Sequence, residues 1–201
     1  MGITDEAVAP GYEPHDVSMT FTNRYGVCRD KAALLVSLLR LGGIEAFPVL
    51  IHAGAKLDPD VPLPYFNHAI VAATRDPAAG AAPDAAPYVL MDPTDENARD
   101  LLPSYLCNRS YLVATPAGDP LRVSPVVPAA SNLLHIASRG TADAAGTLTL
   151  HTDLRFDGIN DTAYRNFLVR RKPDERRRFF EGLLKARLSG AELLECVIRP
   201  D

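Results

Sequence analysis

One cysteine in this sequence stands where its thiol could be reactive, at the entrance to an apolar segment. Cys28 is followed by Arg29, Asp30 and Lys31, and then by a largely apolar run that ends at Leu41. The reactive form of cysteine is the thiolate, which the free N–H groups at a helix N-terminus stabilise. The pattern predicts a helix from about Arg29 to Leu41, with Cys28 at its entrance as a candidate nucleophile. Because free cysteines are also commonly buried as small apolar residues, a structural role stays open.

A thiol nucleophile needs a base, and the base needs an acceptor that orients it. His68 lies in an apolar, strand-like segment over residues 67–74, and Asp92 ends a second such segment over residues 88–92. Two short strands in succession pair most simply as an antiparallel hairpin, which brings neighbouring side chains on one face close together. We therefore expect His68 to be the base and Asp92 the residue that orients it.

The elements that must position these residues follow from the hydrophobic pattern. The helix over residues 29–41 has so little polar surface that we expect it to be buried on most sides. Gly42-Gly43 ends this helix, and residues 46–52 then form a buried strand. Residues 1–17 are predicted to be a polar lead-in. Residues 75–87, rich in alanine and proline, are predicted to be a mobile connector within the hairpin.

A second region begins near Pro125. Apolar alternation predicts strands there, and two periodic segments predict helices, of which the second has Pro173 in its first turn. The predicted strands cover residues 133–140, 146–158 and 192–199, and the predicted helices cover residues 160–171 and 173–188. The chain is therefore predicted to be an α+β protein. Its core spans residues 1–124, and a smaller β-containing region with two helices spans residues 125–201.

Three segments around the candidate residues carry a family resemblance. GVCRDKAALLVSLLRLGGIEAFPVL, FNHAI and YVLMDPTDE resemble, in order and spacing, the signature segments of the transglutaminase-like superfamily, in particular those of its bacterial members. The resemblance covers about residues 24–100. It implies a papain-like core in which Cys28 is the nucleophile at a helix N-terminus. It also implies that His68, as base and acid, and Asp92, which orients it, lie on adjacent antiparallel strands.

The resemblance has further implications for the site. Many members place Ala-Trp after the histidine, whereas this chain has Ala69-Ile70, which keeps an apolar residue but has no indole. We expect the backbone N–H of Cys28 to contribute to an oxyanion hole, and the second donor stays open between Asn23 and Tyr25. Asp30-Lys31 belongs to the motif, and an ion pair between these two residues is preferred to a contact with substrate.

The resemblance also bears on the whole protein. Its bacterial members typically carry an N-terminal β-rich domain before this core, so we expect the chain to be a fragment of a protein with an additional N-terminal domain. The family favours the bacterial envelope or periplasm, although the first residues of this chain contain no recognisable signal peptide.

Composition argues against several classes of function. A net charge of −4, with 47% hydrophobic and 23% charged residues, is typical of a globular protein and gives no general attraction to nucleic acid or anionic lipid. The clustered arginines at 170–171 and 176–178 are predicted to form a solvated helix face. No apolar run is long enough to span a membrane. The chain has three widely spaced cysteines, Cys28, Cys107 and Cys196. They form neither a disulfide framework nor a metal-binding pattern, so no metal and no organic cofactor is expected.

These observations predict cysteine-dependent acyl transfer on a peptide or protein substrate, at a peptide bond or a glutamine carboxamide. Hydrolysis is favoured over cross-linking, because a compact core shows no evident means of excluding water. The main alternative is a catalytically idle scaffold or peptide-binding module within a larger envelope protein. A third interpretation is a purely structural domain with Cys28 buried.

Overall fold

The computed structural model describes residues 11–61, 64–75 and 87–199 of the chain. The chain divides into two compact units that meet between Leu133 and Leu134. The boundary predicted at residues 124–125 lies earlier, just after a short strand over Arg122–Val123. That prediction of two domains stays a prediction, since a compact unit is not by itself an independently folding domain.

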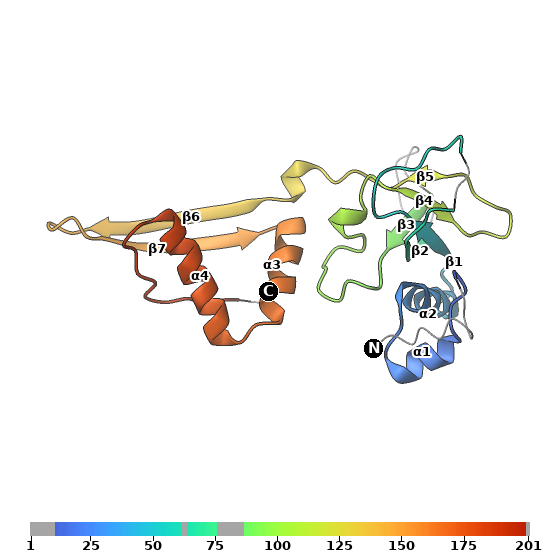
Figure 1. Ribbon diagram of the computed structural model, residues 1–201, viewed down its shortest axis with the longest axis horizontal. Coiled ribbons are helices and arrows are strands. Elements are labelled where there is room, and N and C mark those ends of the chain that lie inside the picture. The colour runs from blue at the N-terminus through green and yellow to red at the C-terminus, as the bar shows by residue number, and fades with distance from the viewer. Residues whose placement is uncertain (1–10, 62–63, 76–86, 200–201) are drawn as a thin grey trace. The chain divides into compact units, whose positions relative to one another are not determined.

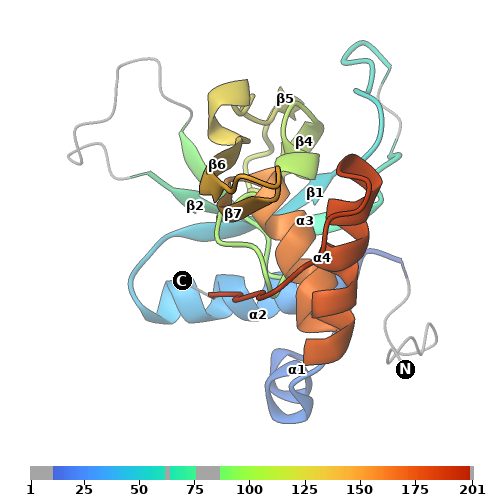
Figure 2. The same cartoon turned by 90° about the vertical axis from the view of Figure 1, so that its left-hand side faces the viewer.

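The first unit combines helices with one antiparallel sheet, which confirms the α+β class for this part of the chain. Its five strands lie in the order β3-β2-β1-β4-β5. The elements are α1 (Val17–Asn23), α2 (Cys28–Leu41), β1 (Ala46–Ile51), β2 (His68–Thr74), β3 (Tyr88–Met91), β4 (Ser110–Val113) and β5 (Arg122–Val123). Figures 1 and 2 show α2 between the sheet and α1. The sequence predicted α2, β1, β2 and β3 and missed α1, β4 and β5, which are short and have weak periodicity.

Helix α2 begins and ends where its sequence signals indicate. The Asp30 carboxylate accepts a hydrogen bond from the Val27 backbone N–H at 3.0 Å, which satisfies one of the polar groups at the start of the helix. Gly43, with φ of 78°, adopts the left-handed conformation that commonly ends a helix. The helix is less buried than predicted: Leu38 is 49% exposed and Leu41 is 86% exposed. Its apolar residues surround the whole helix, but the sheet covers only one side.

The core of the first unit consists of two hydrophobic clusters that contain alternate residues of β2. One includes Ile70 and Ala72 with residues of β1, β3 and β4, and the other includes Ala69, Val71 and Ala73 with α2. Side chains of successive strand residues point to opposite faces of a sheet, so these clusters occupy its two faces. The near-continuous apolar sequence of β2 follows from this burial on both sides.

Strands β2 and β3 pair in the antiparallel arrangement that the sequence predicted. Val71 is paired with Met91 and Thr74 with Tyr88. Continuing this register by one residue places Asp92 opposite Ile70, two residues along β2 from His68. Diagonal neighbours at this spacing are within reach of long side chains. The predicted connector at residues 75–87 and the predicted lead-in at residues 1–17 lie largely outside the described residues.

The second unit contains a long hairpin followed by two helices. Its elements are β6 (Leu134–Ala142), β7 (Leu148–Phe156), α3 (Ile159–Val169) and α4 (Pro173–Arg187), and Figure 1 shows the two strands paired along their length. These elements confirm two predicted strands and both helices. The strand predicted over residues 192–199 is wrong: no strand is present there, because these residues pair with neither strand of the hairpin. Aromatic rings join the elements, with the Phe156 and Tyr164 ring centroids 4.0 Å apart.

Among the described residues, no helix has both the length and the apolar character needed to cross a membrane.

Candidate active site

The candidate nucleophile occupies the first position of helix α2. Cys28 is half-buried and packs against the hydrophobic cluster between α2 and β2. Its pKa is lowered, first by a hydrogen bond with His68 and then, against the opposing effect of burial, by hydrogen bonds from the backbone N–H groups of Ala69 and Arg29. The thiolate is therefore stabilised both by the imidazole and by the start of the helix.

The candidate base and its acceptor meet at the start of β2 and the end of β3. His68 Nε2 and Asp92 Oδ2 are 2.9 Å apart. The His68 side chain is 15% exposed, whereas the Asp92 side chain has no exposed surface. Because Nε2 faces Asp92, the ring nitrogen that remains for Cys28 is Nδ1. The structure thus brings Cys28, His68 and Asp92 together in one hydrogen-bonded chain.

The protonation of this chain follows from its contacts. Burial acts to lower the pKa of His68, but its hydrogen bonds and charge interactions with Asp92 and Cys28 outweigh burial and raise the pKa from 6.5 to about 9. Burial acts to raise the pKa of Asp92, yet hydrogen bonds from His68 and Thr94 hold it below its ordinary value. These shifts all favour the charged forms, so the arrangement stabilises a thiolate at Cys28, an imidazolium at His68 and a carboxylate at Asp92.

Two residues that the sequence analysis did not select complete the surroundings of Asp92. Thr94 donates to Asp92 Oδ1 from its backbone N–H at 2.9 Å and from its hydroxyl at 2.7 Å. The Tyr105 hydroxyl donates to Asp92 Oδ2 at 2.9 Å. The contact from Thr94 could have been predicted, because an aspartate commonly accepts from the residue two positions later in a turn. The sequence offers no signal for Tyr105, which comes from a separate short helix (Ser104–Leu106).

The neighbours of Cys28 on α2 correct one prediction. Asp30 and Lys31 do not pair with each other. The Asp30 Oδ1 atom lies 3.1 Å from His15 Nδ1 and accepts from the His15 backbone N–H at 2.9 Å, while Lys31 Nζ lies 3.1 Å from Glu96 Oε1. Successive helical residues point in directions about 100° apart, so Asp30 faces the interior while Lys31 faces solvent. His15 is itself buried.

The chain approaches itself closely just before Cys28. A Cβ atom added at Gly26 would lie 2.7 Å from Asp30 Cβ and 3.0 Å from Thr20 Cγ2. Only glycine fits this contact without displacing a neighbour. Gly26 therefore allows α1 and the start of α2 to pack against each other.

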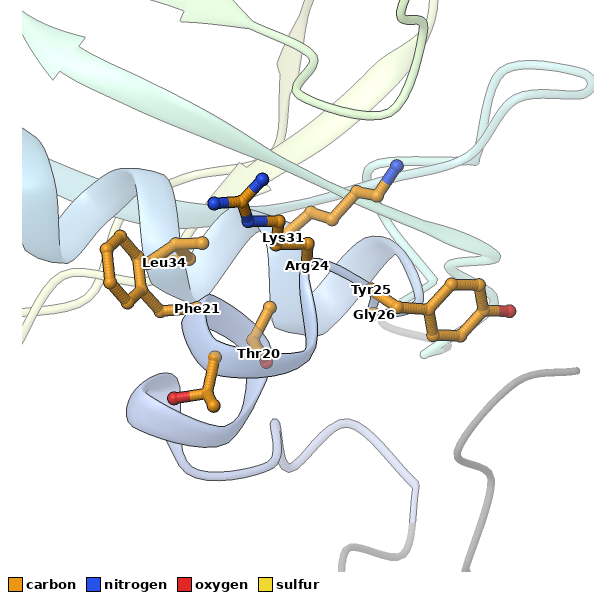
Figure 3. A pocket seen from close by; sticks show the side chains of 8 residues that line it. Thr20, Phe21, Arg24, Tyr25, Gly26, Lys31 and Leu34 are labelled. Carbon is orange, nitrogen blue, oxygen red and sulfur yellow. The ribbon is translucent and has the colours of Figure 1, made fainter.

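A cavity of about 530 Å³ lies beside this segment, lined by residues of α1, α2 and the turn between them. Figure 3 shows the residues that line this cavity. The Tyr25 ring points away from Phe21 and Leu34, two of the apolar residues in the lining. Neither this cavity nor a second one that includes His52 and Asn67 is lined by Cys28, His68 or Asp92. The prediction that Asn23 or Tyr25 provides a second oxyanion donor stays a prediction.

The other two cysteines lack the surroundings of Cys28. All three are free and half-buried. The pKa of Cys107 is raised, first by burial and then by the charge of Asp100, which is the opposite of the shift at Cys28. Within the described part of the chain, no cluster of three or more His, Cys, Asp or Glu residues could hold a metal ion.

No protein family, curated protein or solved structure was found to match this chain. The resemblance of its three motifs to the transglutaminase-like superfamily therefore stays a prediction. The function proposed below rests on the geometry of the site.

Proposed function

We propose that the first unit is a papain-like, transglutaminase-like core that performs cysteine-dependent acyl transfer on peptide bonds or glutamine carboxamides. The observation that carries this proposal is the hydrogen-bonded chain from Cys28 through His68 to Asp92. In it the pKa of the thiol is lowered and the pKa of the imidazole is raised to about 9. A thiolate–imidazolium pair at neutral pH is the resting state of an activated cysteine nucleophile.

The first half of the reaction uses Cys28 as nucleophile and His68 as acid. The Cys28 thiolate attacks the carbonyl carbon, and the carbonyl π electrons move to oxygen. Because Cys28 is the first residue of α2, its backbone N–H has no partner within the helix and can donate to this oxyanion. The oxyanion then re-forms the carbonyl as the C–N bond breaks, and the His68 imidazolium gives its proton to the leaving nitrogen, which departs as ammonia or an amine. The product on the protein is a thioester at Cys28.

The second half regenerates the thiolate. Neutral His68 takes a proton from an acceptor molecule, which attacks the thioester carbonyl. The C–S bond then breaks, and the thiolate leaves beside the imidazolium. Water as acceptor gives a carboxylic acid, whereas an amine gives a new amide. We favour hydrolysis, because Cys28 and His68 both retain exposed surface through which water can reach the thioester.

The pH dependence of alkylation tests the ion pair directly. In the full chain, we expect iodoacetamide to modify Cys28 well below the pH at which it modifies Cys107, since their pKa values shift in opposite directions. His68→Ala removes the largest cause of the lowered pKa and should move the Cys28 profile to higher pH. Mass spectrometry assigns each modification to its cysteine, so Cys107 and Cys196 serve as controls within every sample.

A second measurement tests the acyl-transfer step itself. The candidate substrates are peptides that contain glutamine and peptides that do not. Hydroxylamine in the reaction should trap the acyl group as a hydroxamate, and Cys28→Ala should abolish the product. Ammonia release that depends on an added amine, with no hydrolysis in its absence, would contradict the preference for water. Alkylation of Cys28 no faster than that of Cys107 would contradict the proposed activity itself.

One observation favours a second candidate function, an idle scaffold or peptide-binding module. Neither of the two cavities described above is lined by a residue of the candidate triad, so a peptide could occupy one of them without contacting Cys28. This alternative predicts peptide binding that is unaffected by Cys28→Ala and accompanied by no turnover.

A further inference from the structure

We propose that Tyr105 is a positioning residue of the candidate site, which limits how strongly Asp92 holds the imidazolium of His68. This inference rests on the proposed function, because it concerns the same hydrogen-bonded chain. It assigns a role to a residue that lies outside the three motifs and touches neither Cys28 nor the reacting atoms.

The geometry places two donors on one carboxylate oxygen. Asp92 Oδ2 lies 2.9 Å from His68 Nε2 and 2.9 Å from the Tyr105 hydroxyl, while Thr94 donates twice to Oδ1. Each oxygen of the buried carboxylate therefore has two hydrogen-bond contacts. Tyr105 is the only one of these donors, within the described part of the chain, that shares an oxygen with the histidine.

The backbone on either side of the Tyr105 ring is held by contacts outside the site. Leu106, the next residue, is fully buried, and its carbonyl accepts from the Ser124 hydroxyl at 2.6 Å. Arg109 Nε donates to the Tyr105 carbonyl at 3.2 Å. The backbone around Tyr105 is therefore anchored to the rest of the first unit, and from this position the phenol reaches Asp92.

The hydroxyl remains a donor at all pH values at which the site would work. Burial and the hydrogen bond to Asp92 raise the pKa of Tyr105 above its ordinary value, so the phenol keeps its proton. A hydrogen bond to Oδ2 spreads part of the carboxylate charge onto the phenol. Less charge then faces the imidazolium, so its proton is held less tightly.

This competition matters for the second half of the proposed reaction. There His68 must be neutral to accept a proton from water, and a higher pKa leaves less of it neutral at pH 7. Tyr105 thus keeps Asp92 from stabilising the imidazolium so strongly that the thioester persists. Thr94 holds the other oxygen, so removal of the phenol hydroxyl should change the strength of the His68 contact more than the orientation of the carboxylate.

The test is Tyr105→Phe in the full chain, which removes the hydroxyl and keeps the ring. The pKa of His68 is measured by NMR titration in a Cys28→Ala background, so that the result does not depend on a reactive thiol. We expect the pKa of His68 to rise by about half a unit to one unit relative to the same background with Tyr105. Tyr164→Phe, which removes a hydroxyl from the aromatic stack of the second unit, should leave it unchanged.

With Cys28 present, hydrolysis by Tyr105→Phe should fall about 3- to 10-fold at pH 7 and recover at higher pH, since a higher pKa moves the required neutral form to higher pH. An unchanged or lowered pKa of His68 in Tyr105→Phe would overturn the inference. Failure of the proposed function is distinguishable from this outcome, because it would appear in the wild type as an unreactive Cys28 while the His68 titration remained measurable.

Discussion

The two thiols Cys28 and Cys107 have the same chemistry but opposite pKa shifts, and their neighbours account for the difference. Cys28 is beside an imidazole and the N–H groups of Ala69 and Arg29, whereas Cys107 is beside the carboxylate of Asp100. Positive charge and N–H donors stabilise a thiolate, and negative charge and burial destabilise it. The reactivity of a cysteine in this chain is therefore set by a few contacts.

Asp92→Asn tests the contribution of the carboxylate at the scale of the single residue. The amide keeps the size of the side chain and removes its charge, so the imidazolium loses its negative partner. We expect the pKa of His68 to fall from about 9 toward 6.5, by about 1–3 units. The ion pair should then be lost above neutral pH, and the alkylation profile of Cys28 should move to higher pH.

Asp157→Asn is the matched control for this exchange. His135 Nε2 and Asp157 Oδ2 are 3.1 Å apart, but the pair is largely exposed. An exposed ion pair contributes little, so this variant should leave the Cys28 profile where it is in the wild type. Equal profiles for Asp92→Asn and the wild type would show that Asp92 does not stabilise the imidazolium.

At the scale of elements, the start of α2 is held by a buried contact between Asp30 and the segment that precedes α1. The carboxylate accepts from the backbone N–H groups of His15 and Val27, one on each oxygen. Burial acts to raise the pKa of Asp30, but these hydrogen bonds hold it below its ordinary value. The stabilisation from this lowered pKa is present above 3.8 and is lost as the pH falls through the lower folded-state pKa.

Asp30→Asn should therefore destabilise the protein at pH 7. An asparagine has one acceptor oxygen, so one of the two buried backbone N–H groups loses its partner. We expect a loss of about 1–3 kcal/mol in the free energy of unfolding, measured by urea denaturation. Glu96→Gln makes the same exchange in an exposed pair with Lys31 and should change the stability by less than about 1 kcal/mol. Equal effects of the two variants would contradict a special role for Asp30.

At the scale of the whole molecule, the two units differ in how much they bury. Both hydrophobic clusters and all three candidate triad residues belong to the first unit. None of the described residues of the second unit is buried, and its hairpin exposes apolar side chains, with Ile136 63% exposed and Leu148 60% exposed. Burial of apolar surface is the main source of folding stability, so the first unit has the larger share.

Separate expression of the two units tests this difference. We expect residues 1–133 to unfold cooperatively and to retain the alkylation profile of Cys28 seen in the full chain. Residues 134–201 alone should show no cooperative transition by circular dichroism, since they lack a buried core. A sharp transition in residues 134–201 would show that the second unit folds without the first. Loss of the Cys28 profile from residues 1–133 would show that the candidate site depends on the second unit.

Local patterns in the sequence were enough to predict the elements in which these patterns are strong. The apolar run before Gly42 predicted α2, and Pro173 in a first turn predicted α4, because these signals act within a few residues of the chain. The apolar strands β1, β2 and β3 were predicted for the same reason. Short elements such as α1 and β4 were missed, and residues 192–199 were wrongly assigned, because a strand exists only where a partner offers hydrogen bonds.

The sequence by itself determined that Cys28 opens a helix, that His68 lies on one strand and that Asp92 lies at the end of a neighbouring one. Only the tertiary structure decided that Asp30 turns to His15 rather than to Lys31, that the sheet leaves part of α2 exposed, and that Tyr105 donates to Asp92. Helix periodicity and strand alternation are local properties of the chain. A contact between residues from separate elements depends on packing, register and the direction of each side chain, which no local pattern specifies.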